Sequence, residues 1–439
     1  MQLTVSVTID LPATASIADA ETSILAAGRH AMRLALHATA QSVQAHVRSC
    51  PACSAPALHA DGTAQRIVLT SFGRVDLPIL RKRCPHCGLR FRASSTFLAP
   101  LGPDNITPHL AHVAADAGAS WPYATAARWL RDTLDAQISP ESVRRCTITH
   151  GSLVAQQQHH EAERLLTPPT AEQIRAEREA EIRAPLGSTT PAPTCLLVEL
   201  DGGWIGSRDA ARGMEGKVSV VATGRECRGK DRSLLAPRRY AATFGSAEQI
   251  GRLTYAAAVR LNGEESRQQV VLGDGAEWIK TQVAWQFPNA VKILDWSHLE
   301  RAMHKAIRAG RPGKERKAER KELYMGVGGA LWEGRLDDAL GLLGDIRGRD
   351  GGRHERVEEM MAYVRGQREW LGDYGAWQEA GYPIGSGAVE REVEIVLNRR
   401  MKKQGMRWKR HNADGMAALR VERINRTWDE AMEQRKLAA

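Results

Sequence analysis

The sequence predicts a multidomain α+β protein in which an α/β core is interrupted by an all-α insertion. Three observations lead to this fold class. Two Cys-x-x-C pairs lie near the N-terminus, the middle of the chain alternates short apolar runs with amphipathic segments, and residues 301–379 carry helical patterns only. At 439 residues the chain is longer than a typical single domain, so we expect several domains.

The composition is that of a basic chain with an ordinary hydrophobic content. Hydrophobic residues make up 43% of the sequence, and the formal net charge is +10. Such a balance indicates either an anionic polymer as partner or simply a basic soluble protein. No apolar run approaches the ~18 residues that a membrane span requires, and no signal peptide is evident. We therefore expect a cytoplasmic protein with reduced cysteines and no membrane partner.

The first 45 residues begin with an alternating apolar pattern from Leu3 to Ile9, which predicts a short strand. An alanine-rich stretch follows and predicts a helix through Ala38. This part of the chain carries no residues with evident chemistry, so we assign it no site.

Cys50 and Cys53 form the first Cys-x-x-C pair, and Cys84 and Cys87 form the second. Four thiolates in two such pairs can complete the tetrahedral shell of one Zn²⁺ ion. The stretch between the pairs has the pattern of a hairpin, as in a zinc ribbon, although its 30 residues exceed the commonest spacing. Two disulfides are the alternative, which a cytosolic chain disfavours. Because four protein ligands leave no open position, we expect a structural ion and not a catalytic one.

Residues 101–152 predict short helices joined by tight turns. Thr107 caps the first helix, and Ser139-Pro140 opens the third, which leaves Arg144 and Arg145 pointing outward. Short helices in this arrangement, the last one basic, are typical of a helix-turn-helix. A plain helical connector is the alternative. We expect the two arginines to contact double-stranded DNA.

After a charged helix and a small-residue linker, the pattern changes to α/β. Three strands come first, then helices alternate with two further strands, which is the element order of a ribonuclease-H-like domain. The first strand ends at Asp201, the fourth at Asp274 and the fifth at Asp295, with His298 three residues later. In this topology the first and fourth strands are neighbours. We therefore expect Asp201 and Asp274 to face each other where sites collect, at the carboxyl ends of the strands.

A helical, mixed-charge stretch follows the fifth strand, and we interpret it as an insertion. Ser386 then fits the cap of another helix, whose first turn carries Glu390. Seven of the twelve residues from Arg399 to Arg410 are Lys or Arg. This basic run favours a surface that binds along the DNA backbone over an ordinary solvated helix face. The residues expected to bind DNA in this run are Arg399, Arg400, Lys402, Lys403, Arg407, Lys409 and Arg410, with Trp408 placed to stack on an unpaired base.

Asp201, Asp274 and Glu390 stand out as candidate metal ligands. Carboxylate oxygens suit Mg²⁺ or Mn²⁺, and two such ions ~3.5–4 Å apart activate the attacking oxygen and stabilise the leaving oxygen of a phosphodiester. Each carboxylate alone is more often a turn or cap residue, but the three in this order are more specific. Glu199 is an alternative to Asp201, because the two share one face of the strand.

The sequence resembles bacterial insertion-sequence transposases of the DDE class and is most similar to the ISKra group. The matching motifs are the two Cys-x-x-C pairs, LVELDGGWIG, VVLGDGAEWI, AVKILDWSHL, PIGSGAVE and KKQGMRW. The resemblance implies that Asp201, Asp274 and Glu390 form a catalytic triad that holds two Mg²⁺ (or Mn²⁺) ions. It also implies that Asp295-x-x-His298 is the auxiliary C/D-x-x-H element of Mutator-like and hAT transposases. The residues alone leave His298 either as an ordinary helix histidine paired with Asp295 or as a DNA contact.

We expect a DNA transposase that binds terminal inverted repeats and target DNA, as a homodimer or higher oligomer in the bacterial cytoplasm, and catalyses strand cleavage and strand transfer. The alternatives are a domesticated DNA-binding regulator with a silent nuclease domain and a nuclease that cuts without joining. The expected segments are an N-terminal strand and helix (1–45), zinc ribbon (46–100), helix-turn-helix (101–152), helical linker (153–193), first part of the core (194–300), helical insertion (301–380), final core helix with the basic run (381–412) and C-terminal helix (413–439).

Overall fold

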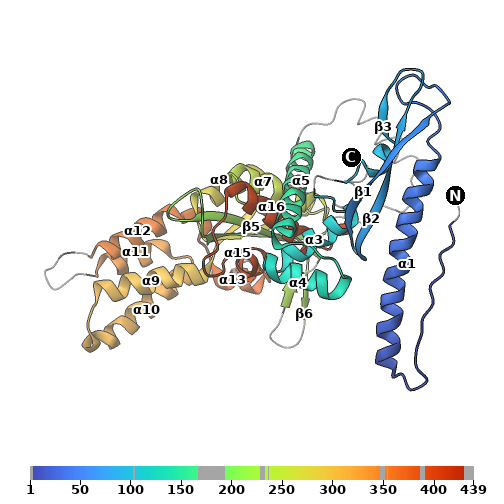
Figure 1. The fold of residues 1–439 in the computed structure, drawn as a ribbon. Coiled ribbons are helices and arrows are strands. Elements are labelled where there is room, and N and C mark those ends of the chain that lie inside the picture. The colour runs from blue at the N-terminus through green and yellow to red at the C-terminus, as the bar shows by residue number, and fades with distance from the viewer. Residues whose placement is uncertain are drawn as a thin grey trace. The chain divides into compact units, whose positions relative to one another are not determined.

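The computed structural model describes residues 3–101, 104–166, 193–227, 233–235, 237–346, 352, 354–385 and 391–429. The chain divides into two compact units, Met1–His150 and Gly151–Ala439. Figure 1 labels their helices and strands. Within the described residues, every helix is too short or too polar to span a lipid bilayer.

The first unit packs a long helix against a three-stranded sheet. Helix α1 (Ile17–Ala45) begins at a capping box built on Ser16. Strands β1 (His59–Thr70) and β2 (Gly73–Arg83) form an antiparallel hairpin, to which β3 (Arg90–Arg92) adds a third strand. Helix α1 and the hairpin share an apolar core formed by Ala40, Val68, Val75, Leu77, Ile79 and Leu98.

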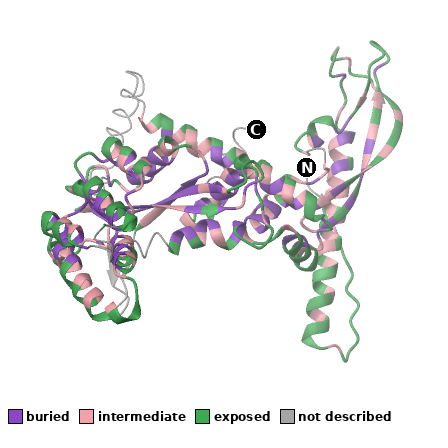
Figure 2. Ribbon diagram, turned by 90° about the vertical axis from the view of Figure 1, so that its left-hand side faces the viewer, coloured by how far each residue is buried: buried purple, intermediate pink, exposed green. Residues whose placement is uncertain are grey.

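The alternating pattern from Leu3 to Ile9 does not form the predicted strand. Residues 3–10 have no regular secondary structure, and Leu3, Val7 and Ile9 are exposed. Alternation produces a strand only where a neighbouring strand can pair with it and one face can be buried. The helix predicted next is confirmed and extends beyond Ala38 to Ala45. Figure 2 shows that much of its surface is exposed.

The helices that follow the ribbon-like sheet are confirmed. After the short α2 (Ser95–Leu98) come α3 (Pro108–Ser120), α4 (Tyr123–Leu134) and α5 (Pro140–Leu166). The Thr107 side chain accepts a hydrogen bond from the backbone of Leu110 and caps α3, as predicted. Helix α5 does not end near residue 150 but runs on to Leu166, so it joins the predicted charged helix without a break. The rest of that helix and the linker at 187–192 lie outside the described residues.

The second unit is built on a mixed five-stranded sheet. Its strands are β4 (Cys195–Ile205), β5 (Met214–Ala222), β8 (Arg238–Thr243), β9 (Gln268–Gly273) and β10 (Val291–Leu294). They lie in the order β10-β9-β4-β5-β8, with β4, β9 and β10 parallel and β5 antiparallel to both of its neighbours. The prediction that the first and fourth strands are neighbours is therefore confirmed. Figure 2 shows the sheet as buried interior, and β5 is buried at nearly every position, as in a sheet covered on both faces.

Helices pack against this sheet on elements far apart in the sequence. Helix α7 (Ala247–Val259), capped by Ser246, lies against β5, β8 and helix α8 (Glu277–Gln286). Helix α16 (Arg410–Asn425) packs against β8. A separate two-stranded sheet, β6 (Arg225–Cys227) and β7 (Ser233–Leu235), lies in the connection between β5 and β8.

In its described residues, the segment predicted to be a helical insertion consists of helices joined by turns, with an isolated β-bridge between Glu333 and Asp373. Its elements are α9 (Trp296–Gly310), η1 (Lys314–Arg316), α10 (Lys317–Trp332), α11 (Leu336–Gly344), α12 (Glu355–Gly366), η2 (Arg368–Trp370) and α13 (Tyr374–Glu379). Helices α9 to α12 pack against one another and form a group at one end of the second unit (Figure 1). The predicted cap Ser386 and Glu390 lie outside the described residues. The chain is described again from Arg391, through the π-helix η3 (Glu394–Asn398) and α15 (Arg399–Met401).

Helices α5 and α16 cross at two glycines within the second unit. A Cβ added at Gly151 would lie 2.6 Å from the backbone oxygen of Gly415, and one added at Gly415 would lie 2.7 Å from the carbonyl carbon of Gly151. Backbone atoms cannot rotate away as side chains can, so this close approach depends on both glycines. Two turns along the helices, Gln158 donates a 2.6 Å hydrogen bond to Glu422.

We predict that Gly151→Ala lowers the free energy of unfolding by about 1–3 kcal/mol, because the added methyl group overpacks the crossing. The matched control is Gly329→Ala in α10, where a Cβ would meet nothing within 4 Å. That change should raise stability by about 0.5–1 kcal/mol through helix propensity alone. Denaturant unfolding of both variants measures the difference. If Gly151→Ala were as stable as the control, the two helices would not cross at these residues.

Candidate functional site

Three aspartates lie immediately after one row of the five-stranded sheet. The register partners in that row are Leu200, Gly273 and Leu294. Asp201, Asp274 and Asp295 each come one residue later on adjacent parallel strands. Parallel strands present their carboxyl ends at one edge of a sheet, where sites collect. The sheet register therefore brings Asp201 and Asp274 to neighbouring positions, as predicted.

Asp201 lies inside β4 and not beyond its end, because the strand continues to Ile205. Its side chain is half-buried, and Oδ1 accepts a 2.7 Å hydrogen bond from the backbone of Gly202. Glu199, the alternative ligand on the same face, is 1% exposed and so enclosed by the core. Asp201 is the more accessible of the two carboxylates.

The chain after the insertion returns to the same strand. A Cβ added at Gly203 would lie 2.6 Å from the Val393 side chain, so the helical segment that begins at Arg391 packs directly on β4. Gly203 and Asp201 are two residues apart on a strand and share a face. Glu390, the third expected ligand, immediately precedes this segment in sequence but lies outside the described residues, and its role stays a prediction.

Asp274 occupies a tight turn that the insertion holds from outside. Its Oδ1 accepts a 2.9 Å hydrogen bond from the backbone of Ala276, and Gly275 has a φ of +81°, which favours glycine. The Tyr363 hydroxyl donates to the Asp274 carbonyl at 3.0 Å, and Gln367 Nε2 donates to the Gly275 carbonyl at 2.8 Å. Burial and the charges of Asp274 and Asp295 raise the pKa of Tyr363, which keeps this hydroxyl protonated as a donor.

Asp295 is fully buried, and its oxygens are bonded within its own helix. Oδ1 accepts hydrogen bonds of 2.7 Å from both the backbone and the hydroxyl of Ser297, and Oδ2 lies 3.1 Å from Nδ1 of His298. This hydrogen bond, opposed by burial and aided by the charges of Asp295 and Asp274, raises the pKa of His298. Asp295 thus caps α9 and orients His298, and its role as an auxiliary residue stays a prediction.

The aspartates do not form a ready-made ligand cluster within the part of the chain that the structure describes. Among those residues, only the four cysteines form a group of three or more potential metal ligands whose donor atoms all lie within 4.8 Å of one another. Asp201 and Asp274 remain as partly accessible carboxylates at adjacent strand positions, which is a pair and not yet a complete site.

Three residues of the insertion hold the strand ends and have no signature in the sequence. Besides Tyr363 on α12 and Gln367 at its C-cap, the buried Tyr374 hydroxyl donates a 2.8 Å hydrogen bond to the Leu294 carbonyl. Helical periodicity indicates which face of a helix is buried, but not that a tyrosine on that face reaches a carbonyl of a distant strand. Sequence reasoning therefore missed them.

Of the two arginines of the predicted helix-turn-helix, Arg145 is exposed and Arg144 is partly exposed, and each lies beside an acid. Arg144 bonds Glu141 at 2.5 Å, one helical turn earlier, and Arg145 lies 2.8 Å from Asp104. These ion pairs offset part of the positive charge that would attract phosphates.

The basic run from Arg399 to Arg410 is only partly a surface. Trp408, expected to stack on a base, is 8% exposed, and its indole N–H donates to the Met401 carbonyl at 3.0 Å. The Arg400 guanidinium is also buried and lies 5.3 Å from the centre of that ring. The position of both residues corrects the prediction, because a buried ring cannot stack on a base. The exposed cations of the run are Arg399, Lys402, Lys403, Arg407, Lys409 and Arg410.

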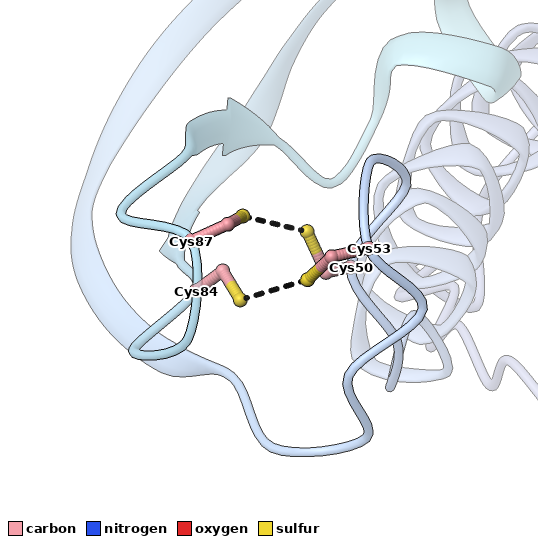
Figure 3. Close-up of side chains that lie close together, drawn as sticks. All are labelled: Cys50, Cys53, Cys84 and Cys87. Atoms are coloured by element: carbon pink, nitrogen blue, oxygen red, sulfur yellow. Dashed lines mark hydrogen bonds between the residues drawn. The ribbon is translucent and has the colours of Figure 1, made fainter.

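The four predicted zinc ligands meet at the base of the hairpin (Figure 3). Cys50 and Cys53 precede β1, whereas Cys84 and Cys87 lie between β2 and β3. The Sγ atoms of Cys50 and Cys87 are 3.6 Å apart, as are those of Cys53 and Cys84. A disulfide would bring the sulfurs to ~2.05 Å, whereas four Zn–S bonds of ~2.3 Å in a tetrahedron place them about 3.8 Å apart. The spacing therefore fits a tetrahedral metal ion, and the four cysteines are free thiols in this structure and not disulfides.

The surroundings of the cluster give the two thiols of its first pair, Cys50 and Cys53, different pKa values. Burial raises the pKa of Cys50, but hydrogen bonds from the backbone of Ala52 and Cys53 and from neighbouring thiols lower it to about 7. A backbone hydrogen bond from Ala55 lowers the pKa of Cys53, yet burial and the neighbouring thiols outweigh it and raise the pKa to about 12. Because the thiolate is the ligand, a metal ion must displace protons here, and its affinity should fall as the pH falls.

We predict about one zinc ion per purified chain and its loss in Cys84→Ser. Loss of the ion should make the hairpin of the first unit sensitive to proteases, because the cluster ties the two ends of β1 and β2 together. Cys195→Ser is the control, since Cys195 is a free cysteine outside the cluster. Elemental analysis and limited proteolysis supply the readout. A metal-free chain with the protease resistance of the wild type would contradict a structural zinc ion.

The comparison with known families covers the region of the strand-end aspartates. The sequence matches the model of the uncharacterised protein family UPF0236 over residues 117–436, which is more than half of the chain. The matched range contains Asp201, Asp274, Asp295 and Glu390, but not the four cysteines. No curated protein matches the sequence. The chain therefore belongs to the uncharacterised protein family UPF0236.

Proposed function

We propose that this protein is a transposase of the DDE class, which binds the ends of an insertion sequence and catalyses metal-dependent cleavage and joining of DNA strands. The observation that carries the proposal is the position of Asp201 and Asp274, one residue beyond paired positions of two adjacent parallel strands. The sheet order supports it, because it is the order expected of a ribonuclease-H-like core. The resemblance of the motifs around Asp201, Asp274 and Glu390 to insertion-sequence transposases supports it independently.

The residues fit a magnesium or manganese centre. Asp201 and Asp274 offer oxygen ligands that are only half-buried, so a hydrated ion can reach them. Glu390 would be the third ligand, on the chain segment that returns to β4. When bound, two such ions would polarise the phosphate and activate the attacking oxygen. The protein's own contribution is to fix the carboxylates: the sheet register sets Asp201, while Tyr363 and Gln367 hold the turn at Asp274.

Asp295 and His298 would act beside the metal centre. Asp295 holds the Nδ1 edge of His298 and favours the protonated imidazole, as its raised pKa indicates. A cationic imidazole at this edge would attract a phosphate oxygen of the DNA. We therefore assign Asp295 as a positioning residue.

The remaining parts would serve DNA binding. One Zn²⁺ ion would fix the cysteine hairpin as a zinc ribbon, and helices α3 to α5 would act as the helix-turn-helix that contacts the terminal repeats. The exposed cations of the basic run would follow the backbone of double-stranded DNA. Two ends must be brought together for transposition, so the active form would be a dimer or a higher oligomer.

Two other functions are compatible with the same architecture. A domesticated regulator would bind DNA through the N-terminal part with a silent nuclease domain, and a nuclease would cut without joining. The presence of Asp201, Asp274 and Glu390 favours an active enzyme over the regulator. Strand joining separates a transposase from a nuclease.

Asp201→Asn, Asp274→Asn and Glu390→Gln should each lower Mg²⁺-dependent cleavage and joining by on the order of 10²-fold or more, because each removes a negative charge from the ligands. Binding of the same DNA should remain, since it depends on other, basic surfaces. The substrate is duplex DNA carrying the sequences that flank the gene. Asp295→Asn should reduce the rate less than these three, since the amide can keep one of the bonds to the start of α9.

Glu277→Gln is the matched control, because Glu277 is an exposed acid three residues from Asp274. It should cut and join at the rate of the wild type. Full activity of Glu390→Gln would show that the third ligand lies elsewhere. Cleavage without joining by the wild type would favour the nuclease, and DNA binding without cleavage would favour the regulator.

A further inference from the structure

We propose that the groove between α9 and α12 binds the phosphate backbone of the DNA strand beside the cleaved bond, so that the helical insertion is a substrate-binding element. This inference rests on the proposed function. The groove has a volume of about 310 Å³ and is formed by one face of each helix. Its lining residues are His298, Arg301, Ala302, Lys305 and Ala306 from α9, and Arg356, Glu359, Met360 and Tyr363 from α12.

One end of the groove reaches the strand-end aspartates. Tyr363 lines it and donates to the Asp274 carbonyl, and His298 lines it and bonds Asp295. From His298 the groove follows α9 for seven residues to Lys305, and from Tyr363 it follows α12 for seven residues to Arg356. At 1.5 Å per residue, this length is about 10 Å. The axial rise of one DNA strand is ~3.4 Å per nucleotide. The groove therefore offers a path for about three nucleotides that leads directly away from the site.

The charges of the groove suit a polyanion. Arg301, Lys305 and Arg356 are exposed and line both walls, whereas Glu359, 3.8 Å from Arg356, is the one acid in the lining. Between them the floor is formed by Ala302, Ala306 and Met360, whose side chains carry no charge. Short alanines let a backbone approach closely, and the cations at the rim are placed for phosphate oxygens on either side.

A second groove in the same unit is also basic. It lies beside α8 and η2, and its cations are Lys280, Lys292, Arg365 and Arg368. Its lining includes neither Tyr363 nor His298, so it does not begin at the hydrogen bonds to Asp274 and Asp295. Because this groove differs from the first in position and not in the sign of its charge, three of its cations, Lys280, Lys292 and Arg368, provide a matched control.

The test compares two triple variants that remove the same charge. One is Arg301→Gln/Lys305→Gln/Arg356→Gln in the α9–α12 groove, and the other is Lys280→Gln/Lys292→Gln/Arg368→Gln in the second groove. Binding of the flanking-end duplex is measured from 50 to 200 mM salt in Ca²⁺, a condition that does not require cleavage. The first variant should flatten the slope of log affinity against log salt by about 0.9 for each lost phosphate contact, and the second should leave it as in the wild type. Glu359→Gln should tighten binding.

Methylphosphonate substitution locates the contact on the DNA. Neutral phosphates within about three nucleotides of the cleaved bond should weaken binding by the wild type, but should not weaken binding by the first variant any further. Equal slopes for the first variant and the wild type, or equal losses in both triple variants, would overturn the proposal. These experiments measure DNA binding, whereas the proposed function is tested by DNA cleavage. If the proposed function were wrong, the wild type would show no Mg²⁺-dependent cleavage, whatever the binding results.

Discussion

The parallel pairing of β4, β9 and β10 is the constraint on which the rest of the candidate site depends. The register of these ladders places Leu200, Gly273 and Leu294 side by side, so the next residue of each strand is an aspartate at the same edge. Any slip of one strand by a single residue would turn its carboxylate to the other face of the sheet. Close packing on both faces of β4, β5 and β9 opposes such a slip, because each side chain would move into a space shaped for a different one.

The insertion reinforces that edge by direct hydrogen bonds. Tyr363, Gln367 and Tyr374 donate to the carbonyls of Asp274, Gly275 and Leu294, which are backbone acceptors at the ends of β9 and β10. Buried carbonyls without donors are costly, so these side chains stabilise a turn that would otherwise need water. The insertion is thus part of the support of the site, and its α9–α12 groove extends outward from the same bonds.

Much of this arrangement could be predicted from the sequence, and the missing parts share one cause. The strands that lead to Asp201, Asp274 and Asp295, the capped helices and the cysteine cluster were predictable because each depends on local pattern or on spacing, although β4 runs on past Asp201 to Ile205. The burial of Trp408 and Arg400 was not, since a basic neighbourhood in the sequence does not reveal that Trp408 pairs with Ser207 in β-bridge fashion. The acid beside Arg144 lies three residues away and was readable as a helix pair, whereas Asp104 beside Arg145 depends on tertiary structure. The N-terminal alternation failed because no strand pairs with it in the described residues.

The most direct test of the account is to locate a bound metal ion without relying on enzymatic activity. Fe²⁺ can replace Mg²⁺ at oxygen ligands and, with ascorbate and peroxide, cuts the polypeptide close to the ion. The account predicts cuts near Asp201 and Asp274 that excess Mg²⁺ suppresses and that Asp274→Asn abolishes. Cuts confined to other acidic surfaces, or cuts at these positions that persist in Asp274→Asn, would contradict a metal centre at the ends of β4 and β9.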